Sequence, residues 1–132
     1  GIDKKQPIWA ENFKHELSKS KMALNLSQGT FSKFYTSDRF AQLVGNGILT
    51  FVDEKTKLNK LFSKDEIIFY KNINDLSLKI NKYKADKESR IRIAKNGMKK
   101  YHKYMNSTII SKYMVNKTLN INIKEKFFWE NK

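Results

Sequence analysis

The sequence predicts an α/β fold: half of a doubly wound domain, with about three parallel strands flanked by helices and a helical C-terminal region. Three short apolar runs of strand-forming residues alternate with segments whose apolar residues recur at helical spacing. Strands that alternate with helices are joined by right-handed crossovers, so their sheet is parallel. The chain has 132 residues, which suffices for one domain at most. An independent doubly wound domain usually has about five or six strands. We therefore treat residues 1–132 as a single, partial domain.

The N-terminal part is expected to contain a helix, a strand and a loop. The helix covers about residues 8–19, because four apolar residues share one of its faces. These are Ile8, Trp9, Phe13 and Leu17. Residues 22–26 form a short apolar run between polar residues, which is typical of a buried strand. Residues 27–35 combine a glycine with hydroxyl residues and are expected to form a loop.

The most informative stretch runs from Tyr35 to Phe51, where a loop is followed by a helix at about 37–44 and a strand at about 48–52. Three residues can cap the start of this helix, because their side-chain oxygens accept a hydrogen bond from a first-turn N–H. They are Thr36, Ser37 and Asp38. Glycines at 45 and 47 are expected to end the helix, since glycine adopts the left-handed C-cap conformation at little cost. A polar loop that enters a helix N-terminus is a common site for anions and ligands in α/β proteins.

The C-terminal part is predicted to add one strand and three helices. A turn at 53–56 and a helical turn near 58–62 precede the strand, which covers residues 66–70. Each helix is expected to begin at a polar group that can cap it. These groups are Asn74–Asp75, Asp86–Glu88 and Asn106–Thr108. Gly97 interrupts the apolar face of the second helix and weakens the prediction at its centre.

The charge balance is strongly basic, with 27 Lys and Arg residues against 13 Asp and Glu residues and a formal net charge of +14. Such a charge favours polyanions as partners. The excess is mostly lysine and is spread over the whole chain, whereas proteins dedicated to nucleic acid more often concentrate arginine and lysine on one face. A lysine-rich solvated surface is the simpler interpretation, so no nucleic-acid partner is expected.

Several residue types limit the possible chemistry and location. The chain has no cysteine, which excludes a disulfide framework and a thiolate metal site. His15 and His102 have no carboxylate or second histidine at metal-ligand spacing, so both are interpreted as surface residues and no metal site is predicted. No run reaches membrane-spanning length and no signal peptide is recognised. We therefore expect a cytoplasmic location.

Seven short motifs resemble the C-terminal end of a group 1 glycosyltransferase. They are Asn25-Leu26-Ser27, Tyr35-Thr36-Ser37-Asp38-Arg39, Gly45-Asn46-Gly47, Glu66-Ile67-Ile68-Phe69-Tyr70, Asp75-Leu76, Ile93-Ala94-Lys95-Asn96-Gly97 before Tyr101, and Asn106-Ser107-Thr108. The resemblance extends from about Pro7 to Val115, and the stretch from Tyr35 to Phe51 is its most specific part. Such enzymes have the GT-B fold, in which two Rossmann-like domains face each other across a cleft. The resemblance therefore implies that the chain is part of the C-terminal, donor-binding domain.

The resemblance also implies a substrate and a set of site residues. In the family, the C-terminal domain holds a nucleotide-diphosphate sugar, which is a substrate and not a cofactor. By the resemblance, Tyr35, Thr36, Ser37 and Asp38 lie near the sugar and diphosphate, and Arg39 can pair with phosphate. Many relatives carry two glutamates eight positions apart. The ribose-binding glutamate corresponds to Gln42, and the other corresponds to Phe34, which cannot replace it. No catalytic residue is assigned.

The implied function is transfer of a sugar to a polysaccharide, lipopolysaccharide or similar acceptor. The acceptor would be a glycan or lipid-linked molecule, bound by an N-terminal domain that this chain lacks, so the chain should not be active alone. The aromatic residues Phe127, Phe128 and Trp129 either pack on the rest of such an enzyme, which is preferred, or enter a membrane interface. Peripheral contact with the inner face of the cytoplasmic membrane is thus a further expectation.

Simpler interpretations of the same residues stay open. Asp38 can cap the helix while Arg39 pairs with Asp38 or Asp53. Gln42 can be an ordinary polar residue on a helix. The whole chain can also be a non-catalytic basic module that binds nucleic acid or an anionic membrane surface.

Overall fold

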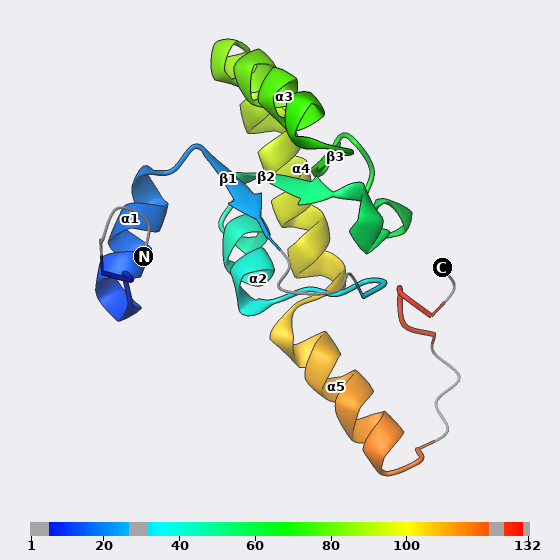
Figure 1. Cartoon of the computed structure of the whole chain (residues 1–132). Coiled ribbons are helices and arrows are strands. Elements are labelled where there is room, and N and C mark those ends of the chain that lie inside the picture. Colours follow the sequence, from blue (N-terminus) through cyan, green and yellow to red (C-terminus); the bar gives the residue numbers. More distant parts are fainter. Residues whose placement is uncertain (1–5, 27–31, 122–125, 131–132) are drawn as a thin grey trace.

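The computed structural model describes residues 6–26, 32–121 and 126–130, which form an open parallel sheet with helices around it (Figure 1). The described strands are β1 (Met22–Asn25), β2 (Leu49–Asp53) and β3 (Ile68–Tyr70). The described α-helices are α1 (Ala10–Lys19), α2 (Asp38–Gly45), α3 (Ile73–Ala85), α4 (Lys87–Tyr104) and α5 (Ser107–Thr118). Two 3₁₀ turns, η2 (Glu54–Thr56) and η3 (Leu58–Lys60), follow β2. The predicted α/β half-domain with a helical C-terminal region is confirmed.

The sheet has the order β1-β2-β3, and both strand pairs are parallel. Met22 lies opposite Leu49, and Asp53 lies opposite Tyr70. The first two strands lie close to their predicted positions. The third begins at Ile68 instead of position 66, because the Glu66 side chain closes a turn by accepting from the Ser63 N–H at 2.7 Å.

Hydrophobic clusters on both faces of the sheet make the fold doubly wound. On one face, Val52 of β2 packs with Phe40 and Val44 of α2. On the other, Leu49 and Phe51 pack with residues of α3 and α4. This alternation along β2 follows from the two-residue period of a strand, which sends neighbouring side chains to opposite faces.

One side of helix α2 packs against α4. The rings of Phe40 and Tyr101 lie 6.3 Å apart in an edge-on arrangement. The Nε2 atom of His102 lies 2.9 Å from the carbonyl oxygen of Gly45, at the C-terminal end of α2. His102 is exposed, as predicted, but it also contacts a helix end that has unpaired carbonyl groups. Contacts with α4 therefore help to hold α2 in its position on the sheet.

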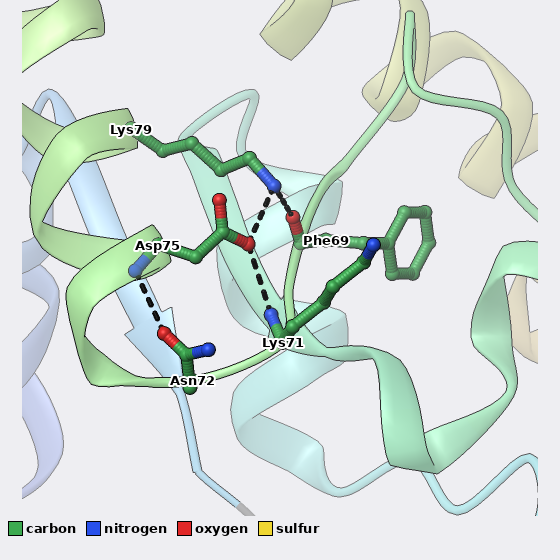
Figure 2. A network of polar contacts seen from close by, with 5 residues as sticks. All are labelled: Phe69, Lys71, Asn72, Asp75 and Lys79. Carbon is green, nitrogen blue, oxygen red and sulfur yellow. Dashed lines mark hydrogen bonds and ion pairs between the residues drawn. The ribbon is translucent and has the colours of Figure 1, made fainter.

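Helix α3 begins two residues earlier than predicted. Asn72, and not Asn74–Asp75, is the N-cap, and its Oδ1 accepts from the Asp75 N–H at 3.0 Å. Asp75 instead lies in the first turn, where its carboxylate accepts from the Lys71 N–H at 3.0 Å (Figure 2). The prediction was wrong because Asn72, Asn74 and Asp75 can all cap, and the extended backbone of Asn72 decides between them.

Lys79 covers part of the open edge of the sheet. Its ammonium donates to the Phe69 carbonyl oxygen at 2.7 Å and to the Asp75 carboxylate at 2.8 Å (Figure 2). Strand β3 is an edge strand, and the outer backbone groups of such strands otherwise promote association with other chains. This lysine therefore satisfies one exposed carbonyl group.

The C-terminal aromatic residues pack on helices of this same chain. Phe128 stacks on Tyr104 of α4 with ring centroids 4.8 Å apart, and Phe127 contacts Tyr113 of α5 edge-on at 5.0 Å. Phe127 is buried. The preferred expectation, packing on the rest of a larger enzyme, is therefore wrong for these contacts, because α4 and α5 already supply the apolar surface. Among the described residues, no helix is both long and apolar enough to cross a membrane.

Candidate functional site

The carboxyl ends of the three strands meet at one edge of the sheet, and α2 and α3 begin there (Figure 1). The loop from Ser32 to Ser37 leads into α2 at this edge. Open α/β sheets bind ligands outside the carboxyl ends of their strands, where helix N-termini present free N–H groups. The stretch that the sequence singled out therefore lies at the edge where the fold can form a site.

Phe34 anchors this loop. Its backbone N–H donates to the Thr56 carbonyl oxygen at 2.8 Å, and its ring packs against the cluster that contains Phe40. It has a positive φ of 63°, a conformation that costs energy for a residue with a side chain. Phe34 thus has a structural role here, and the contacts of its ring explain why an apolar residue suits this position.

The N-terminus of α2 has no side-chain cap. Ser37 is the N-cap residue, with φ −102° and ψ 171°, but its hydroxyl does not accept from the first turn. Asp38, which was also expected to be able to cap, lies inside the first turn. The expected capping bond is therefore absent, and the first-turn N–H groups are not satisfied by a side chain of the described residues. They remain available to an anion.

Arg39 and Asp38 lie side by side in sequence without pairing. Within the described ranges, neither side chain makes an ion pair or a side-chain hydrogen bond, and the Asp53 carboxylate accepts from the Lys55 N–H at 2.8 Å instead. The alternative in which Asp38 caps and Arg39 pairs with an aspartate is therefore wrong. An exposed guanidinium in the first turn of a helix is a ready partner for phosphate.

A groove of 680 Å³ separates α1 from α2. Asp38, Arg39, Gln42 and Asn46 line its α2 side. Ile8, Trp9, Phe13 and Leu17 line its α1 side. Tyr35, Thr36 and Ser37 do not line this groove; they lie in the loop before α2, where the Tyr35 N–H donates to the Ser32 carbonyl oxygen at 3.2 Å. The structure thus places the six predicted site residues in two adjoining sets, three in the loop and three in the groove.

Two tyrosines have pKa values that are raised by burial and by a nearby aspartate. Burial raises the pKa of the Tyr101 hydroxyl, and the nearby Asp38 carboxylate raises that pKa further. Burial, followed by the charge of Asp53, likewise raises the pKa of Tyr70, which lies opposite Asp53 in the sheet. Both phenols are therefore uncharged at physiological pH.

Two features of the site were missed in the sequence. The first is the side chain of Asn25, which is only 3% exposed and whose Oδ1 atom has no hydrogen-bond partner among the described residues. A polar residue at the carboxyl end of an apolar strand is a signal that could have identified it. The second is the wall that α1 forms opposite Arg39 and Gln42, which no local pattern reveals. Among the residues that the structure describes, no three His, Cys, Asp or Glu side chains come together as a potential metal site.

The fold defines a class of protein: an α/β half-domain with a parallel sheet, in which the carboxyl edge is the usual place for a ligand site. The model of the glycosyl transferase-like family matches residues 1–114, which is most of the chain. The chain therefore belongs to the glycosyl transferase-like family, with a domain of the group 1 type. Comparisons with curated proteins and with solved structures gave no match.

Proposed function

We propose that this domain binds the nucleotide-sugar donor of a glycosyltransferase. The observation that carries the proposal is the uncapped N-terminus of α2 with the unpaired Arg39 in its first turn, at the carboxyl edge of the sheet. Free N–H groups, the positive end of the helix dipole and a guanidinium all favour a diphosphate. A family member that transfers sugars needs such a site for its donor.

The same groups would also assist the reaction. When the bond between the sugar and the diphosphate breaks, negative charge develops on the leaving diphosphate. Donors that are already in place stabilise that charge without having to reorganise. The Asp38 carboxylate would repel phosphate, so its role is to accept hydrogen bonds from sugar hydroxyl groups. Gln42, one turn further along α2, would reach the ribose, as a neutral substitute for the acid of many relatives.

The other parts of the proposed reaction lie outside these residues. The acceptor is a glycan or lipid-linked molecule of polysaccharide or lipopolysaccharide assembly, bound by a further domain of the same enzyme. Among the described residues, β1 has a strand partner on one side only, so its outer edge is open. Further strands of a donor-binding domain would pair there.

Equilibrium binding of UDP and of GDP, measured by isothermal titration calorimetry, tests the donor site. Arg39→Ala should weaken binding of the better ligand by about tenfold or more, because a charge-assisted hydrogen bond to a charged group is lost. Arg92→Ala is the matched control, since Arg92 is also exposed but pairs with Asp65 at 3.3 Å. Equal affinities of the wild type and Arg39→Ala would contradict the proposal, and so would an equal loss in both variants.

We also propose that the protein works in the cytoplasm, in peripheral contact with the inner face of the cytoplasmic membrane. Lys103, Lys112 and Lys126 surround a hollow beside Tyr104 and Phe128, and basic clusters are attracted to anionic lipid headgroups. Cosedimentation with vesicles of phosphatidylglycerol and phosphatidylcholine measures this contact. Lys103→Glu with Lys126→Glu should reduce it more than Lys14→Glu with Lys19→Glu, which changes the same number of charges on α1. Equal effects would contradict a specific contact surface.

A further inference from the structure

The groove between α1 and α2 has two walls of different character. The α1 wall is mostly apolar, with Lys14 as its charged member, and none of the α1 residues is buried by the described part of the chain. Trp9, the N-cap residue of α1, is 75% exposed. The α2 wall carries the polar side chains of Arg39 and Gln42. An exposed indole opposite hydrogen-bonding groups is suited to a ligand that is both flat and polar.

The two helices run in the same direction, which places the open end of the groove beside the proposed diphosphate site. Helix α1 leads into the start of β1, and α2 follows the end of β1, so both begin at the carboxyl edge of the sheet (Figure 1). Trp9 precedes the first residue of α1, and Arg39 is in the first turn of α2. Both residues therefore belong to the same end of the groove.

The order of groups along α2 indicates which part of a ligand would enter the groove. If the diphosphate lies at the N-terminus of α2 and the ribose at Gln42, these groups are about 4.5 Å apart along the helix axis. The base is joined to the ribose, so from Gln42 it would extend across the groove toward α1. The groove volume of 680 Å³ lies within the range of about 300–1,000 Å³ that is usual for small-molecule sites.

We infer that α1 forms the base-binding wall of the donor site, with Trp9 stacking on the nucleobase in the groove opposite Arg39 and Gln42. This inference rests on the proposed function, because it assumes that a nucleoside diphosphate binds at α2. Beyond the proposed function, it assigns Trp9 and helix α1 to contact with the nucleoside. Both would then contribute to the choice of base.

The two tryptophans of the chain, Trp9 and Trp129, allow a direct test. Trp129→Phe leaves Trp9 as the only source of indole fluorescence in the full chain. UDP and GDP should then quench its emission in a saturable way, because a stacked base contacts the indole directly. Inorganic pyrophosphate should bind without quenching, since it carries no base. Trp9→Phe, in which only Trp129 emits, should show no quenching with any of the three ligands.

Affinity provides the second readout. Trp9→Ala should weaken binding of the preferred nucleoside diphosphate by about tenfold, the usual scale for loss of one aromatic stack on a base, and should leave pyrophosphate binding unchanged. Trp9→Phe should restore much of the loss. Met114→Ala, which removes another exposed apolar side chain, is the control and should change neither affinity.

The possible failures are distinguishable. If nucleotides bind and depend on Arg39, but Trp9 emission and Trp9→Ala affinity are unchanged, the base lies elsewhere and the inference is overturned while the donor site stands. Quenching by UDP-glucose but not by UDP would place the sugar in the groove and also overturn it. An equal loss of pyrophosphate binding in Trp9→Ala would show a structural role for Trp9. If neither nucleotides nor pyrophosphate bind, the proposed function itself fails.

Discussion

Gly97 of α4 packs directly against the backbone carbonyl oxygen of Glu66, so closely that no side chain fits between them. The contact brings α4 against the segment that leads into β3, and Val44 of α2 lies on the same side of the glycine. The glycine that weakened the helix prediction is therefore the residue that allows α4 to approach the sheet. The motif from Ile93 to Gly97 therefore has a structural role, because it lies where α4 packs against the rest of the chain.

Gly97→Ala should lower the free energy of unfolding by about 1–3 kcal/mol, because the new methyl group must displace backbone. Gly45→Ala is the matched control. A Cβ atom at position 45 would lie 3.5 Å from the Tyr101 ring, an ordinary contact, so this variant should be neutral or slightly more stable. Chemical denaturation measures both values. Equal stability of the two variants would contradict the close packing of Gly97.

Arg90 closes the C-terminal end of α3. Its guanidinium is largely buried and donates to the carbonyl oxygens of Tyr83 at 2.7 Å and Lys84 at 3.3 Å. Arg90→Ala should reduce the free energy of unfolding by about 1–3 kcal/mol, because buried carbonyl groups lose their donor. Arg92→Ala, which removes an exposed ion pair with Asp65, should cost less than about 1 kcal/mol. Thermal or urea unfolding that ranked the two variants the other way would refute this assignment.

The stability of the protein should fall in acid partly because of Asp75. Its hydrogen bond with Lys79 and then the hydrogen bond from the Lys71 N–H hold the pKa of Asp75 below its ordinary value of 3.8. A lowered pKa in the folded state stabilises the protein above pH 3.8, and that stabilisation is lost as the pH falls through the folded pKa. Asp75→Asn should therefore show a weaker dependence of unfolding free energy on pH below about pH 5. Urea denaturation across this range is the measurement, and identical pH profiles would contradict the assignment.

The fold could be predicted because its signals are local. The apolar runs of β1, β2 and β3 and the helical spacing around Phe40 or Ile93 are each complete within a short segment, so the order of elements follows from the sequence. The start of α3 was harder to predict because several nearby polar residues can cap it. The backbone conformation of Asn72 decides which of them does so. Boundaries near tight turns, such as the start of β3 after Glu66, depend on side-chain contacts that a pattern does not reveal.

The candidate site was only partly predictable for a different reason. The loop and the start of α2 are continuous in sequence, so residues 35–42 could be selected together. The groove depends on how α1 lies beside α2, and the packing of Phe128 on Tyr104 depends on contacts between distant segments. Such relationships are non-local, and a single sequence carries no direct signal for them. The predicted loop covers residues 27–35, and positions 27–31 of it lie outside the described residues.

The most direct test of the donor site is an NMR titration of the ¹⁵N-labelled protein with UDP and with GDP. If the donor binds at the start of α2, the amide signals of residues 35–42 should shift in a saturable way, most strongly at the start of α2, and the shifts should persist when the salt concentration is raised. Exposed charge pairs are screened within a Debye length of about 8 Å at physiological ionic strength, so binding by scattered lysines would behave differently. Shifts spread over the lysines of α3, α4 and α5 that vanish with added salt would contradict a nucleotide-sugar site and would instead support a basic binding module.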